Sequence, residues 1–124
     1  MDQVEVKAVC GAFLMIAFAD SRFDRLEEGR FLGTVANDPM LAKLDTETLE
    51  TCYNSLVAHF TKDYAGAAAD VLAAVKSVKN AEDMVKAVKH ASRLAIVADQ
   101  KIMPQEEAAL DSIALALGFE KGSV

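Results

Sequence analysis

The sequence of 124 residues has no tryptophan, only two cysteines, two prolines and six glycines. So few cysteines exclude a disulfide-rich scaffold, and the wide separation of Cys10 and Cys52 argues against a zinc site built on closely spaced thiols. The scarcity of glycine and proline excludes fibrous and low-complexity chains. Basic residues are also in deficit, with 13 Lys and Arg against 19 Asp and Glu for a formal charge of −6. That balance argues against nucleic-acid binding, which needs clustered positive charge.

Alanine is abundant instead, with 22 residues in a chain whose hydrophobic fraction is 52%. Alanine loses no side-chain entropy in a helix and covers little strand surface, so this composition favours helices. The length suits a single core, and no segment shows the sustained period-two alternation of a half-buried strand. We therefore expect an all-α protein in which residues 1–124 form one domain of about six to seven helices.

Apolar spacing and capping residues predict where these helices lie. The expected ranges are 3–19, 24–36, a short turn over 40–43, 46–60, 62–79, 80–98 and 104–117, with Gly118 as the residue that ends the last helix. The uncharged run 8–19 is similar to a signal peptide, but Asp2 and Glu5 precede it where a signal has positive charge. The run is also too short to span a bilayer. We interpret it as a buried core helix.

Both cysteines lie in apolar helical patterns, at positions 10 and 52. Free cysteine is among the most buried residue types. We interpret the two thiols as buried structural groups of a protein in the reducing cytoplasm, where disulfides are rare.

A ten-residue pattern occurs twice, at an offset of 79 residues. Residues 19–28 read ADSRFDRLEE and residues 98–107 read ADQKIMPQEE, so the Ala, the Asp and both Glu are identical. Each copy joins an apolar helix to a second amphipathic helix that carries Glu-Glu in its first turn. Internal repeats of this kind indicate related structural units. We therefore interpret residues 3–36 and 81–118 as two related helix–turn–helix units.

This pattern, present twice in an all-helical domain of this size, resembles the tellurite-resistance protein TerB family. The related N-terminal domain of a membrane-anchored J-domain co-chaperone shares it. The family usually has Gly after the Asp, whereas Ser21 and Gln100 stand there in this sequence, so the chain looks like a divergent member. The resemblance implies a TerB-like helical fold, a role in stress or tellurite resistance, and an acidic cluster for a divalent cation.

Four acids from the two copies are the first-rank candidate metal ligands: Asp20, Glu27, Asp99 and Glu106. Asp24, Glu28 and Glu107 are of second rank, and the counterpart of Asp24 is Met103. If the two units pack about a pseudo-two-fold axis, these carboxylates meet, and such oxygen ligands favour Ca²⁺ or Mg²⁺ over Zn²⁺. The alternative is structural, because Asp can cap the turn and Glu stabilises the first turn of a helix.

No catalytic motif is present. The sequence contains no G-x-S-x-G, no glycine-rich phosphate loop and no H-E-x-x-H. His59 and His90 stand on separate predicted helices with no acid or thiol at catalytic spacing, and we interpret them as core-edge or solvated residues. We therefore expect no enzymatic activity.

The function predicted from these observations is that of a non-catalytic cytoplasmic accessory protein of stress or tellurite resistance that binds a divalent cation. One alternative is a protein-interaction module whose acids only cap helices, and another is a small-ligand carrier with a cleft between the repeats. Five basic residues predict a solvated face or a contact with an acidic partner: Lys76, Lys79, Lys86, Lys89 and Arg93. We expect the protein to bind a protein partner, and to neither bind nucleic acid nor insert into a membrane. A homo-oligomer is also possible.

Overall fold

The computed structural model describes residues 3–19, 46–99 and 104–119. Within these ranges it has helices and no strands, which confirms the all-α class. The helices are α1 (Gln3–Ala17), α3 (Thr46–Lys62), α4 (Tyr64–Ser77), α5 (Glu82–Asp99) and α6 (Pro104–Ala116). The described ranges thus contain five helices against the six to seven expected for the whole chain. Two of the expected segments, 24–36 and 40–43, lie outside the described residues.

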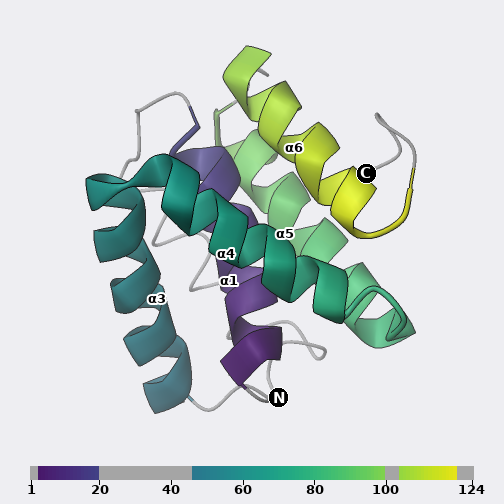
Figure 1. Ribbon diagram of the computed structural model, residues 1–124, viewed down its shortest axis with the longest axis horizontal. Helices are drawn as coiled ribbons and strands as arrows, with labels where there is room; N and C mark the ends of the chain where they lie inside the picture. Colours follow the sequence, from purple (N-terminus) through teal and green to yellow (C-terminus); the bar gives the residue numbers. More distant parts are fainter. Residues whose placement is uncertain (1–2, 20–45, 100–103, 120–124) are drawn as a thin grey trace.

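Helix α1 is the centre of the described part of the protein. It contacts α3, α4, α5 and α6, which surround it (Figure 1). Every residue from 8 to 17 is buried. A helix that is apolar on all sides is stable in water only when other elements cover all of those sides. The interpretation of this run as a core helix is confirmed, although the helix ends at Ala17 rather than at residue 19.

Among the described residues, no helix combines the length and the apolar character that crossing a membrane requires.

Asp63 separates α3 from α4. Its carboxylate oxygen Oδ1 accepts a hydrogen bond from the Gly66 N–H at 3.1 Å, which makes Asp63 the N-cap of α4. The expected start at Lys62 is therefore two residues too early. Close to this junction the Phe60 ring stacks on Phe18 with centroids 5.6 Å apart. The Tyr64 hydroxyl donates a hydrogen bond to the Met15 carbonyl at 2.9 Å, so the junction is tied to the end of α1.

Gly118 stops α6 just beyond its last helical residue, Ala116, as the sequence predicts. Gly118 has φ 87°, in the left-handed region that a residue without Cβ adopts without strain. Its N–H donates to the Leu115 carbonyl and the Phe119 N–H donates to the Ala114 carbonyl, which is the Schellman pattern. The Lys89 Nζ atom of α5 lies 4.0 Å from the centroid of the Phe119 ring. This cation–π contact ties the end of α6 to α5.

Helices α1 and α4 approach closely at Gly11. A Cβ atom built on Gly11 would lie 2.9 Å from Val71 Cγ1 and nearer still to Cγ2, and the Val71 side chain is fully buried. Glycine inside a helix costs about 1 kcal/mol relative to alanine. The close approach of α4 explains why glycine occupies this position in the middle of α1.

Substituting Gly11→Ala is expected to lower the free energy of unfolding by about 1–3 kcal/mol, because overpacking of the core outweighs the gain in helix propensity. Urea denaturation followed by circular dichroism measures the change.

Val71→Ala supplies the matched control, since it removes the two methyl groups that the new Cβ would meet. The loss of unfolding free energy in the double variant Gly11→Ala/Val71→Ala is expected to be smaller than the sum of the two single losses by about 1 kcal/mol or more. A Gly11→Ala variant more stable than the parent protein would contradict this account of the helix crossing.

Candidate functional site

The two ends of the second acidic pattern, residues 98–99 and 104–107, are described, and the helices that carry them are as expected. Asp99 is the last residue of α5, and α6 begins at Pro104. Glu106 and Glu107 therefore occupy the first turn of α6. Their environments differ, because the Glu106 side chain is 2% exposed whereas Glu107 is exposed.

Glu106 is one of two buried polar side chains among the described residues. The other is Ser92, whose hydroxyl donates to the Val88 carbonyl one turn earlier at 2.8 Å. A serine in that arrangement is a common and neutral feature of helices. A buried carboxylate is more costly, since its charge must be compensated by hydrogen bonds or by opposite charge. The helix N-terminus supplies part of this compensation for Glu106.

The remaining predicted ligands cannot be placed beside Glu106. Asp20, Asp24, Glu27 and Glu28 lie outside the described residues, and for Asp99 only the backbone is described. In the ranges 3–19, 46–99 and 104–119, no three Asp, Glu, His or Cys side chains gather in a way that would hold a metal ion. The four-carboxylate metal site thus stays a prediction.

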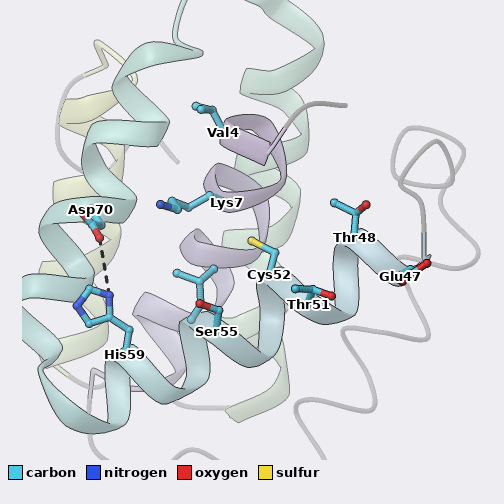
Figure 2. A pocket seen from close by; sticks show the side chains of 10 residues that line it. Val4, Lys7, Glu47, Thr48, Thr51, Cys52, Ser55, His59 and Asp70 are labelled. Carbon is cyan, nitrogen blue, oxygen red and sulfur yellow. Dashed lines mark ion pairs between the residues drawn. The ribbon is translucent and has the colours of Figure 1, made fainter.

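A second candidate site is a pocket of about 590 Å³ between α1, α3 and α4 (Figure 2). Helix α3 forms one wall, α1 contributes Lys7, and α4 contributes Asp70 on the opposite side. The side chains of α3 that carry polar or sulfur atoms into this wall include Thr51, Cys52, Ser55 and His59. This pocket does not lie between the two repeat units, where the small-ligand alternative would have its cleft, because α3 and α4 belong to neither unit.

The sequence contains only part of the signal for this pocket. Residues 48, 52, 55 and 59 recur at helical spacing, which places them along one side of α3 beside its apolar face. No periodicity connects that side to Lys7 or Asp70, which come from two other helices. No acid or thiol stands at catalytic spacing from His59 in the sequence, whereas the fold brings His59 Nδ1 to 3.7 Å from Asp70 Oδ2.

The pair of His59 and Asp70 contributes little stability, because its side chains are 39% and 58% exposed and water screens the charges. The partly buried position of His59 agrees with the core-edge placement expected for it. His90 is also partly buried.

The two thiols differ in environment. Burial raises the pKa of the Cys10 thiol far above its ordinary value, and the nearby Cys52 adds to the effect. Burial also raises the pKa of the Cys52 thiol, against the opposing effect of the Lys7 ammonium. Cys10 is fully buried, as expected of a structural thiol. Cys52 is only half-buried and opens onto the pocket, which the sequence analysis did not foresee.

Replacing the buried Glu106 should destabilise the protein more than replacing the exposed Glu107. Glu106→Ala is expected to lower the free energy of unfolding by about 2–4 kcal/mol, because the groups that compensate the buried carboxylate lose it. Glu107→Ala, which removes an exposed carboxylate from the same turn, should change it by no more than about 0.5 kcal/mol. Urea denaturation of both variants checks the pair, and equal effects would show that burial of Glu106 has no energetic consequence.

Alkylation of the native protein should modify one thiol. Iodoacetamide is expected to react at Cys52 and to leave Cys10 unmodified until the protein is unfolded. Because only the thiolate reacts and burial raises the pKa of Cys52, the rate should still be rising with pH above the ordinary thiol pKa of about 8.5. Peptide mapping by mass spectrometry identifies the site, and native Cys52→Ser protein should stay unmodified. Modification of Cys10 at a comparable rate would contradict the prediction.

The order of the helices agrees with a family assignment by sequence. Residues 6–124 match the family model of the tellurite resistance protein TerB, so the match includes almost all of α1 and the whole of α3 to α6. No curated protein and no solved structure matches the chain. The resemblance drawn from residues 19–28 and 98–107 is confirmed by a match that extends far beyond those windows. The chain belongs to the TerB family of tellurite-resistance proteins.

Proposed function

We propose that the protein is a non-catalytic cytoplasmic accessory protein of stress or tellurite resistance, and that it binds a divalent cation through Asp20, Glu27, Asp99 and Glu106. Membership of the TerB family supports the resistance role. The buried carboxylate of Glu106 is the observation that supports the cation site.

Glu106 and Glu107 are adjacent acids in contrasting environments. Both acids stand in the first turn of α6, where a carboxylate stabilises the helix N-terminus without leaving water. Glu107 is exposed, as that role allows, whereas Glu106 is 2% exposed. Burying a carboxylate is costly unless a counter-charge or hydrogen bonds compensate it. A divalent cation shared among several carboxylates is one such counter-charge.

The position of Asp99 supports the same conclusion. Asp99 ends α5 and Glu106 lies in the first turn of α6, so both acids stand at one junction between consecutive helices. An anion at the C-terminal end of a helix is disfavoured by the helix dipole, and a bound cation would offset that cost. The first repeat carries Asp20 and Glu27 at the same spacing. Two such junctions would supply four carboxylates, a ligand set that suits Ca²⁺ or Mg²⁺.

Isothermal titration calorimetry of metal-stripped protein with Ca²⁺, Mg²⁺ and Zn²⁺ tests the proposal. We expect Ca²⁺ or Mg²⁺ to bind more tightly than Zn²⁺, because the ligands are all oxygen atoms. The double variant Asp20→Asn/Asp99→Asn should lose this binding, whereas Glu107→Gln, a matched change in the same acidic pattern, should retain most of it. Absence of binding in the millimolar range, or unchanged binding by the double variant, would refute the cation site.

The alternative function is a protein-interaction module in which the same acids only stabilise helix ends. The placement of Glu106 and Glu107 in the first turn of α6 favours it, since carboxylates there interact favourably with the helix dipole. Under this alternative the double variant Asp20→Asn/Asp99→Asn has a lower melting temperature than the parent protein in metal-free buffer. Adding a divalent cation then changes the melting temperature of neither protein. The exposed Lys76, Lys79 and Arg93 would then be available to an acidic protein partner.

A further inference from the structure

The pocket between α1, α3 and α4 contains the Lys7 ammonium, which forms no ion pair with the described residues although Glu47 and Asp70 line the same pocket. Lys7 is the only charged residue of α1 between residues 6 and 17. Its side chain is partly buried and extends into the pocket (Figure 2). Among the described residues, ion pairs join His59 to Asp70 and Lys86 to Glu82, and Lys7 takes part in neither. An anionic ligand would complete the environment of this ammonium.

The α3 wall of the same pocket carries two hydroxyl groups that could donate hydrogen bonds to a ligand. Other hydroxyls of the described helices donate to a backbone carbonyl one turn earlier, namely those of Thr61, Ser77, Ser92 and Ser112. The hydroxyls of Thr51 and Ser55 line the pocket and make no such bond within the described ranges. An ammonium and two unengaged hydroxyls form a set of donors suited to the oxygens of an anion.

The charges around this donor set restrict the anion to a single negative charge. Asp70 borders the pocket opposite α3, and its carboxylate oxygen Oδ2 lies 3.7 Å from His59 Nδ1. Glu47 lines the pocket nearer the start of α3. Both carboxylates would repel a phosphate dianion more strongly than a carboxylate monoanion.

The remaining lining indicates an organic molecule. Leu56 and Val4 add apolar surface to the wall, and the half-buried Cys52 thiol adds more. A volume of about 590 Å³ lies within the range of small-molecule pockets. We infer that this pocket binds a small organic monocarboxylate, with the Lys7 ammonium and the Thr51 and Ser55 hydroxyls holding the carboxylate group. This site is separate from the acidic turns, and its occupancy requires no metal ion.

Titration of the full-length ¹⁵N-labelled protein with benzoate, followed by NMR chemical shifts, tests the inference. Benzoate is expected to produce saturable shifts concentrated in residues 4–7 and 47–59. Benzamide, which has the same ring and no charge, should bind about tenfold more weakly or less, because its interaction with the ammonium is lost. Inorganic phosphate at a pH where the dianion predominates should also bind more weakly than benzoate.

Two lysine variants provide a matched comparison at equal net charge. Lys7→Met should weaken benzoate binding about tenfold or more, since it removes the ammonium and keeps the length of the side chain. Lys86→Met removes a 62% exposed ammonium that lies 3.6 Å from Glu82 and outside the pocket, and it should leave benzoate binding unchanged. In the parent protein, saturating benzoate should also slow alkylation of Cys52.

If Lys7→Met proves unfolded, the double variant Thr51→Val/Ser55→Ala makes the test, because both side chains are exposed and their replacement leaves the core intact. It should weaken benzoate binding several-fold with an otherwise unchanged spectrum. The inference is overturned by the absence of saturable shifts in the millimolar range, by equal binding of benzoate and benzamide, or by equal affinities of the two lysine variants. None of these outcomes bears on the cation site, which is measured separately by calorimetry.

Discussion

The need to cover α1 on every side is the constraint on which the described fold depends. Residues 8–17 of this helix are all buried, so no side of that stretch is left for water. Four helices contact it, and each needs only one apolar face of its own because the other face meets solvent. Small residues in α1 shorten the distance to these neighbours, most clearly at Gly11 against Val71. The abundance of alanine and the all-helical architecture follow from the same requirement.

The sequence predicts the helices well because their apolar periodicity repeats over several turns. The expected bounds of α3 to α6 lie within about two residues of those observed. The start of α4 was misplaced because Asp63 lies inside a continuous helical pattern, and its role as a cap depends on the Gly66 N–H that folds back onto it. Gly118 was predicted correctly because a glycine after the last apolar residue is a strong local signal. Local sequence signals therefore predict where the helices begin and end. They do not predict which residues of different helices come into contact.

The two candidate sites differ in how much of them the sequence reveals. The acidic repeat is visible because identical residues recur in the same order, and Glu106 and Glu107 both belong to it. Successive residues of a helix point about 100° apart, so one of two adjacent acids can face the interior while the other faces water. The buried Glu106 and the exposed Glu107 show this difference. The pocket has no such repeat, because its donors come from three helices with unrelated local patterns.

The pocket is nevertheless a consequence of the way α1 is covered. Helices α3 and α4 meet at Asp63 and run apart from that junction (Figure 1). Near the junction, Phe60 and Tyr64 close the space over the end of α1. Toward the start of α1 the two helices separate, and Val4 is 46% exposed there. A charged residue is tolerated in α1 only where the surrounding helices leave such a gap, which is why Lys7 can occur in a helix otherwise buried from residue 6 to residue 17. The requirement that buries α1 thus also explains why its one interior ammonium faces an open, polar pocket.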